Sequence, residues 1–276
     1  MLRSLYAGVS GLKNHQIRMD IIGNNIANVN TAGFKASRVV FQDIYSQTLK
    51  PAAAAGAAGG TNPQQVGLGV TVAAIDVMHT RTGAQYTGAP LDVSIEGDGF
   101  FVVNDGTTNY FTRVGNLTTD GTNTLVSSNG YQVQGYMYDN TVTPPTRSAT
   151  LSDIVIPANY SDVTITKNGD IVGINKTTNV KETIATIGLA TFPNQNALEK
   201  MGSSMYRPNA NSGAPAYTTP ATNNSATLNP GSLEMSNVDL AQEFTDMIIT
   251  QRGFQANSRI ITTSDNLLEE LINLKR

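Results

Sequence analysis

The sequence of 276 residues contains neither cysteine nor tryptophan, and only 14% of its residues are charged. The absence of cysteine excludes disulfides, thiolate nucleophiles and cysteine-ligated zinc sites. Charged residues make up about 25% of an ordinary soluble domain, so this surface is polar but weakly charged. The net charge of -3 provides no basic excess to face phosphates, which argues against nucleic-acid binding. Such a surface suits close packing among many copies of one chain.

Long hydrophobic runs are also missing. No apolar stretch reaches the ~18 residues that a membrane-spanning helix needs, so we expect no membrane insertion. Near the amino terminus, Lys13 and Arg18 interrupt any apolar core of a secretory signal. We therefore expect that a protein exported from the cell in this form uses a route that cleaves no signal peptide.

The sequence lacks the usual catalytic and ligand-binding motifs. It has no H-E-x-x-H, no phosphate-binding G-x-x-x-x-G-K-[ST], no G-x-G-x-x-G and no G-x-S-x-G. The two histidines, His15 and His79, fit a solvated surface better than the role of a metal ligand or a base. We therefore predict no catalytic, cofactor-binding or metal site, and a protein that is not an enzyme.

Both ends of the chain carry the apolar spacing of amphipathic helices. Residues recur at intervals of three and four, which is typical of the seam of a coiled coil or helical bundle. We predict that this seam mediates assembly. Its members are Leu2, Leu5, Val9, Leu12, Met19, Ile26, Leu240, Phe244, Met247, Phe254, Ile261, Leu268 and Ile272. Asn237 or Ser236 is expected to cap the second helix.

Between the helices the apolar period changes from 3.6 to two. Residues 34–50 keep a short amphipathic pattern, and residues 51–65 form an Ala/Gly/Pro-rich stretch that reads as an extended or mobile linker. Strands are expected at 70–72, 91–95, 101–103 and 163–165, separated by Asn-Gly and Asp-Gly turns. Residues 209–230 are expected to be loop.

These patterns predict an α+β chain. A discontinuous, coiled-coil-like helical domain combines residues 1–33 with 235–276, a connecting region covers 34–75, and a mainly antiparallel all-β domain covers 76–234. The two end helices are expected to pair with each other, since each has an apolar stripe that cannot remain in water.

Both ends also carry recognisable sequence signatures. Residues 24–35 fill every position of N-N-[IL]-A-N-x-x-T-x-G-[FY]-[KR], and the carboxyl end contains S-N-V-D, Q-R-x-F and T-x-D-x-L-L. In these positions the chain resembles the bacterial flagellar rod and hook proteins. The matching residues are Asn24, Asn25, Ala27, Asn28, Thr31, Gly33, Phe34, Lys35, Ser236, Asn237, Gln251 and Arg252.

The resemblance implies a structural protein of the bacterial flagellum. Members of that family are exported through the flagellar type III apparatus and polymerise into a hollow helical tube. The paired helices form its inner layer and the β domain lies outside. A homopolymer is expected, located in the hook or basal body outside the cell membrane.

Within the family, the start and end of the chain resemble the hook protein of Gram-positive-type bacteria. That resemblance implies a universal joint transmitting torque from rod to filament, with distal rod, hook cap and hook–filament junction proteins as partners. The alternative is the distal rod protein, because the chain is short for a hook subunit and residues 51–65 resemble a stretch of that protein. A remote alternative is a surface β-protein with a helical stalk.

Overall fold

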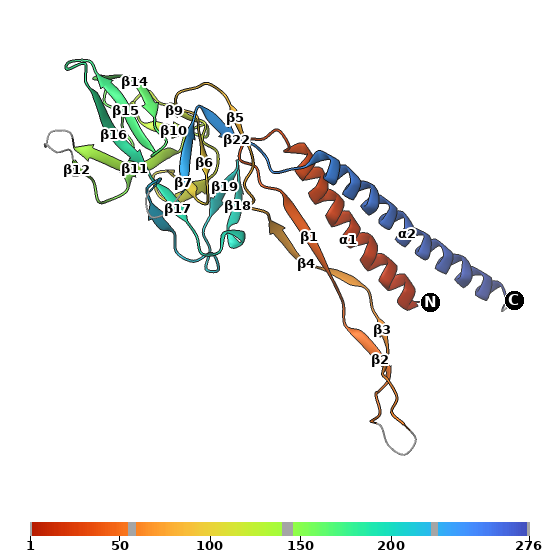
Figure 1. Ribbon diagram of the computed structural model, residues 1–276. Helices are drawn as coiled ribbons and strands as arrows, with labels where there is room; N and C mark the ends of the chain where they lie inside the picture. The colour runs from red at the N-terminus through yellow and green to blue at the C-terminus, as the bar shows by residue number, and fades with distance from the viewer. Residues whose placement is uncertain (1, 55–58, 140–145, 222–225, 275–276) are drawn as a thin grey trace. The chain divides into compact units, whose positions relative to one another are not determined.

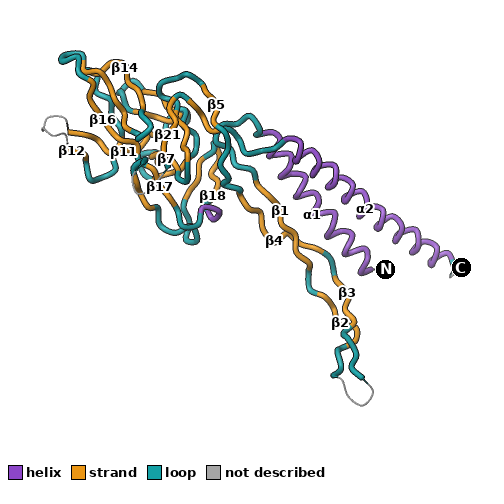
Figure 2. The backbone as a smooth tube through the Cα atoms, in the orientation of Figure 1, coloured by secondary structure: helices purple, strands orange, loops and turns teal. Residues whose placement is uncertain are grey.

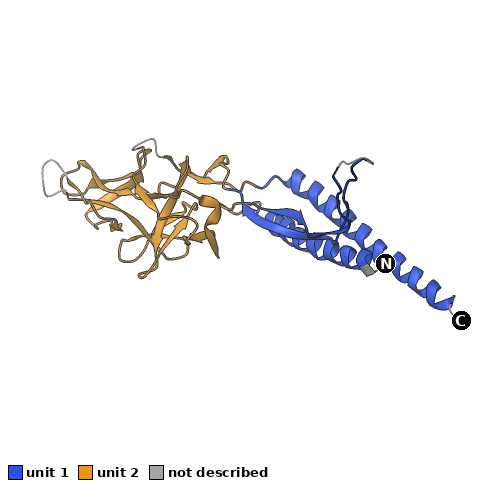
Figure 3. Cartoon of the chain, turned by 90° about the horizontal axis from the view of Figure 1, so that it is seen from below, with its two compact units in different colours: residues 1–28, 36–78, 238–276 blue, residues 29–35, 79–237 orange. Residues whose placement is uncertain are grey.

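The computed structural model describes residues 2–54, 59–139, 146–221 and 226–274 (Figure 1). The chain forms two compact units, which Figure 3 distinguishes by colour. We call Met1–Asn28, Ala36–Met78 and Val238–Arg276 the helical unit, and Val29–Lys35 with His79–Asn237 the β unit. The helical unit is therefore assembled from three separate stretches of sequence.

Two long helices dominate the helical unit, as the sequence predicts. Helix α1 spans Leu2–Ala27 and helix α2 spans Leu240–Asn273. Helix α2 begins because the Asp239 carboxylate accepts hydrogen bonds from the backbone N–H groups of Ala241 (2.9 Å) and Gln242 (3.3 Å), an N-cap that satisfies donors left open by the first turn. The prediction of Asn237 or Ser236 as the cap was therefore wrong.

A long β-ribbon completes the helical unit (Figure 2). Strand β1 (Ser37–Asp43) pairs antiparallel with β4 (Val70–Val77), and β2 (Ser46–Lys50) pairs antiparallel with β3 (Gln64–Gly67). Much of the stretch predicted as a connecting region is thus an ordered ribbon. An isolated bridge between Ala53 and Thr61 extends it into the Ala/Gly/Pro-rich segment, of which residues 55–58 lie outside the described part.

The β unit is a mainly antiparallel β structure. Its strands are β5 (Ala84–Tyr86), β6 (Val93–Glu96), β7 (Phe100–Asn104), β8 (Asn109–Thr112), β9 (Leu117–Thr119), β10 (Leu125–Ser127), β11 (Gln132–Asp139), β12 (Thr146–Arg147), β13 (Ser152–Asp153), β14 (Tyr160–Ile165), β15 (Asp170–Asn175), β16 (Lys181–Ile187), β17 (Leu189–Thr191), β18 (Glu199–Gly202), β19 (Met205–Arg207), β20 (Ala216–Thr218), β21 (Thr227–Pro230) and β22 (Ser232–Glu234), with one 3-10 turn, η1 (Gln195–Ala197).

The largest sheet runs in the order β14-β15-β16-β11-β7-β8-β19-β18, with shorter strands attached to its sides. Two further pairs, β21 with β6 and β22 with β5, lie outside that sheet. The four stretches that the sequence predicts as strands all contain strands. The loop predicted over 209–230 was partly wrong, because β20 and β21 lie within it.

Strand β7 explains how the β unit builds its core. Successive side chains of a strand point to opposite faces, and all four apolar residues of β7 are buried on one face or the other. Phe101 and Val103 join the larger cluster with Ile154, Ile187 and Leu189, whereas Phe100 and Val102 join the smaller cluster with Phe111, Phe192 and Tyr206. A strand buried on both faces has an unbroken apolar sequence, as here.

Candidate assembly surface and signature clusters

Helices α1 and α2 pack against each other in antiparallel orientation. A Cβ atom placed on Gly8 would lie 3.4 Å from Cγ1 of Ile261, and near the opposite end of α1 the Arg18 guanidinium contacts the Asp246 carboxylate at 3.0 Å. Numbers therefore rise along one helix as they fall along the other. The residues at the centre of this contact are small or polar, since the buried residues of α2 are Thr250 and Ser264.

The predicted seam residues are half-buried or exposed in the single chain. Val9, Leu240, Phe244 and Ile272 are exposed. The other seam residues with described side chains are half-buried, namely Leu5, Leu12, Met19, Ile26, Met247, Phe254, Ile261 and Leu268; the side chain of Leu2 lies outside the described part. The role of these residues in assembly stays a prediction.

A second apolar stripe on α2 was missed by the sequence analysis. Ile249, Ile260, Leu267 and Leu271 are 42–55% exposed, and Leu274 continues their line to the end of the described helix. Their spacings of eleven, seven, four and three place them on one face. Scanning α2 for a second three-four row, offset from the first, would have found them. The helix thus carries more apolar surface than α1 covers.

The second asparagine of the amino-terminal signature organises the helical unit. The buried Asn25 amide donates to the backbone oxygen of Ser37 and to the Glu243 carboxylate, each at 2.9 Å, and its own oxygen accepts from the N–H of Ser37 at 3.0 Å. Burial raises the pKa of Glu243, against the hydrogen bond from Asn25. One side chain thereby joins α1, β1 and α2, which requires both a donor and an acceptor.

The last residue of the same signature is buried in the β unit. The Lys35 ammonium, fully buried, donates to the Glu234 carboxylate at 2.6 Å and to the Thr80 backbone oxygen at 2.8 Å. The second oxygen of Glu234 lies 3.5 Å from the buried Arg113 guanidinium, which donates to the Gly97 oxygen at 2.9 Å. One carboxylate therefore serves two buried cations, which we call the Lys35 cluster.

Aromatic rings and a histidine surround the Lys35 cluster. Arg113 lies 5.4 Å from the centre of the Phe100 ring, and the His79 ring meets those of Phe100 and Tyr206 edge-on at 5.6 and 5.3 Å. Burial lowers the pKa of Lys35 although Glu234 opposes this shift. Burial, followed by the charges of Arg113, Lys35 and Lys200, lowers the pKa of His79 to about 4. His79 is thus a neutral packing residue, and its predicted solvated position was wrong.

Several other signature residues shape the chain next to these clusters. Gly33 has a φ of +67°, which favours glycine, and a Cβ there would lie 2.8 Å from Val114. Phe34 lies under the Lys200 ammonium at 4.9 Å. The Asn237 amide donates to the Thr80 hydroxyl at 2.8 Å. These contacts show the signature holding the backbone in place.

The remaining signature positions are less buried. Asn24 and Asn28 close the end of α1, where the Asn28 amide donates to the Asn24 backbone oxygen at 2.9 Å. Gln251 and Arg252 are exposed on α2, and Arg252 donates to Gln255 of its own helix at 3.1 Å. Ala27 and Thr31 are exposed and Ser236 is half-buried.

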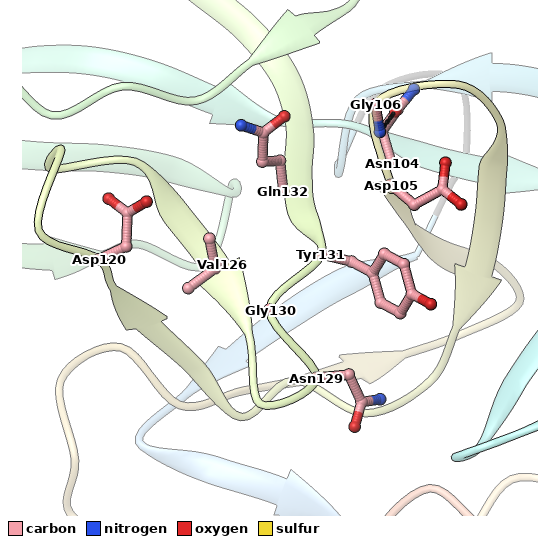
Figure 4. Close-up of a pocket in the computed structure, with 9 residues that line it drawn as sticks. All are labelled: Asn104, Asp105, Gly106, Asp120, Val126, Asn129, Gly130, Tyr131 and Gln132. Atoms are coloured by element: carbon pink, nitrogen blue, oxygen red, sulfur yellow. Dashed lines mark hydrogen bonds between the residues drawn. The ribbon is translucent and has the colours of Figure 1, made fainter.

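The β unit contains a polar cavity of about 420 Å³ between its turns (Figure 4). Its two carboxylates are occupied by their own turns: Asp105 accepts from the N–H groups of Thr107 and Thr108, and Asp120 from those of Thr122 and Thr124. The bonds from the Thr108 and Thr107 N–H groups lower the pKa of Asp105, and those from the Thr122 hydroxyl and the Thr124 N–H lower the pKa of Asp120. Such Asx turns use the two carboxylates structurally.

Two findings apply to the residues that the structure describes. No group of three or more His, Asp or Glu side chains there is arranged to hold a metal ion. Neither described helix combines the length and apolar character needed to cross a membrane.

Comparisons with known proteins match three parts of the chain to family models. Residues 5–35 match the flagella basal body rod protein family, residues 94–173 the D1 domain of the flagellar hook protein FlgE/F/G, and residues 229–274 the carboxyl-terminal part of the flagellar basal body rod FlgEFG protein. The matched ends contain both signatures.

Curated relatives cover the whole chain. The flagellar basal-body rod protein FlgG of Bacillus subtilis is 47% identical over 278 positions, covering 100% of both chains. The FlgG of Borreliella burgdorferi is 35% identical over 282 positions, again covering 100% of both. The flagellar hook protein FlgE of Treponema pallidum is 30% identical, but that alignment needs 463 positions to cover 100% of both chains.

Proposed function

The chain belongs to the bacterial flagellar rod and hook protein family, and on that basis we propose that it is the distal rod subunit of the flagellar basal body, self-assembling into a hollow helical tube. The observation that carries the proposal is the alignment with a rod protein at 47% identity over 278 positions, with almost no insertions. The hook alignment at 30% extends to 463 positions, against 276 residues here.

The sequence analysis favoured the hook, and the comparisons favour its alternative. A hook assignment would require this chain to do without the additional residues that make up the length of the hook relative. The hook therefore remains the second candidate, supported by the family model of residues 94–173, whose description covers hook and rod proteins together. The hook cap and hook–filament junction partners belong to that second candidate.

We infer that copies of the chain associate through the helical unit. The exposed stripe of Ile249, Ile260, Leu267 and Leu271 would be unfavourable in water, because each apolar Å² left exposed forgoes about 25 cal/mol. A helix apolar on more than one side is typical of a helix buried on more than one side. The predicted seam residues, which are half-buried or exposed in the single chain, would then meet neighbouring copies in a coiled-coil-like inner layer.

We propose that the ribbon also contacts neighbouring copies. Tyr45, Leu49 and Val66, in or beside its distal strands β2 and β3, are all exposed. A two-stranded ribbon is marginally stable by itself, so a neighbour covering it would stabilise it. Inner helices, a connecting ribbon and an outer β unit would correspond to the domain plan of residues 1–33 with 235–276, 34–75 and 76–234. The export apparatus and adjacent rod and hook proteins are the further partners expected.

Electron microscopy of a deletion strain separates the two candidates. A strain lacking the distal rod subunit should retain only a short proximal rod, because later parts need it as a base. A strain lacking the hook subunit should retain a full-length rod without a hook. Full-length rods in the deletion strain would contradict the proposed function, and complementation with this chain should restore hooks and swimming.

A further inference from the structure

Two glycines of the helix pair lie where the opposite helix presents a polar side chain. A Cβ atom on Gly11 of α1 would lie 2.7 Å from the Asn257 amide nitrogen, and a Cβ on Gly253 of α2 would lie 2.7 Å from Cε1 of His15. At distances under 3.0 Å something must shift, here the facing Asn257 or His15 side chain. Each glycine is therefore a gap that fits one particular residue of the other helix.

The two contacts are reciprocal. In α1 the gap Gly11 precedes the polar residue His15 by four positions, and in α2 the gap Gly253 precedes Asn257 by four. In antiparallel helices such a pair interlocks twice, because Gly11 faces Asn257 at the same register in which His15 faces Gly253. We call Gly11, His15, Gly253 and Asn257 the quartet.

The quartet distinguishes registers that the apolar seam does not. Seam residues recur every seven positions, so sliding one helix by seven brings apolar residues together again. The same slide would place Asn257 against Ser4 or Arg18, and His15 against Asp246 or Ile260, where no glycine gap exists. A polar residue at one seam-like position is a known way to fix the register of paired helices.

Both polar residues are held in place by other contacts. The Asn257 amide donates to the Gly253 backbone oxygen at 3.1 Å, and the His15 ring meets the Phe41 ring edge-on at 5.9 Å. Burial, followed by the charge of Arg18, lowers the pKa of His15, so the imidazole is neutral near pH 7.

We propose that the quartet sets the antiparallel orientation and register of α1 on α2. The apolar residues around it supply contact area without choosing a register. This inference goes beyond the proposed function, because it applies equally to a rod or a hook subunit and is tested on the single chain.

Disulfide trapping reads the register directly, since the chain contains no cysteine. The double variant Gly8→Cys/Ile261→Cys reports the observed register, in which these residues touch. The double variant Gly8→Cys/Leu268→Cys reports a slide of seven. Mass on a non-reducing gel separates bonds within one chain from bonds between two. In an otherwise unchanged full-length chain we expect the first pair to form an intrachain disulfide and the second to form little.

The test variant is Gly11→Asn, and its matched control is Gly23→Asn, because a Cβ on Gly23 of the same helix meets nothing within 4 Å. Gly11→Asn should reduce trapping of the observed register by about tenfold or more, as overpacking a fitted contact does. The exchange variant Gly11→Asn/Asn257→Gly places the asparagine on α1 and the facing glycine on α2. It should recover most of the lost trapping of the observed register.

Two results would overturn the proposal. If Gly11→Asn traps the observed register as well as Gly23→Asn does, the apolar seam sets the register. If Gly11→Asn loses trapping and the exchange variant does not recover it, the loss reflects added volume alone. The exchange variant keeps the test decisive where the single variant prevents helix pairing altogether.

Discussion

Strand β7 and helix α2 treat their apolar residues in opposite ways. In β7, Phe100, Phe101, Val102 and Val103 are all 0% exposed, whereas in α2 Phe244 and Leu267 are half exposed. The difference extends to the units that contain them. Among described residues that are buried and hydrophobic, only Ile22 and Ala36 belong to the helical unit. The β unit therefore has a core of its own, whereas the helical unit leaves apolar surface exposed, which we propose that other copies cover.

The comparison predicts that the largest single-residue losses of stability fall in the β unit, at the Lys35 cluster. Glu234→Ala leaves Lys35 and Arg113 buried without a carboxylate, which should reduce the free energy of unfolding by about 3–5 kcal/mol. Lys35→Met should reduce the free energy of unfolding by less than Glu234→Ala does, because Arg113 still neutralises Glu234. Denaturant unfolding followed by circular dichroism measures both.

The control for that prediction is Glu199→Ala. It removes an ion pair with Arg207 whose side chains are both about half exposed, and exposed pairs contribute at most about 1 kcal/mol. Equal losses for Glu199→Ala and Glu234→Ala would contradict the importance assigned to the cluster.

Acid should weaken the β unit next most strongly, through His79. Its pKa falls from 6.5 to about 4 on folding, through burial and the charges of Arg113, Lys35 and Lys200. A base with a lowered folded pKa contributes its full stability above pH 6.5 and loses it as the pH falls toward 4, here up to about 3 kcal/mol. His79→Phe should flatten the stability profile over that range. An unchanged difference between pH 7 and pH 4 in the variant would rule out His79 as the cause.

In the helical unit, substitution of the buried Asn25 should reduce stability more than substitution of any other polar residue, but by less than the changes predicted for the β unit. Asn25→Ala removes three hydrogen bonds and should cost about 1–3 kcal/mol. Asn25→Asp should cost more than Asn25→Ala, because a carboxylate there faces the Ser37 backbone oxygen and Glu243. Asn24→Asp, at an exposed position of the same turn, is the control. Thermal melts that fail to distinguish Asn24→Asp from Asn25→Asp would refute the assignment.

The smallest effect on the isolated chain, and the sharpest test of assembly, is expected at the second stripe of α2. Leu267→Asp should change the stability of the single chain by no more than about 0.5 kcal/mol, as surface substitutions do. It should nevertheless block tube formation, because burying an unpaired charge is costly. Sedimentation and negative-stain microscopy measure tube formation, with Thr262→Asp as the control. Normal tubes from Leu267→Asp would remove this stripe from the assembly surface.

The sequence predicted the end helices because their three-four spacing is long and regular, and the β strands because turns punctuate short alternating runs. It predicted the strand at 70–72 but not the ribbon, since residues 37–43 and 70–77 form the ribbon by pairing with each other. The Lys35 cluster was also out of reach: Lys35, Arg113 and Glu234 are far apart in sequence, and no local pattern marks a buried ion pair. The small-polar centre of the helix contact was hidden because apolar spacing was used to find it.

The central claim is that the helical unit is completed by other copies while the β unit is complete alone. Amide hydrogen exchange, compared between the dilute chain and the assembled tube, tests it most directly. The claim predicts that α1 and α2 exchange much more slowly in the tube, whereas β7 and β11 exchange alike in both states. Helices already as strongly protected as β7 in the dilute chain, with no gain on assembly, would contradict it.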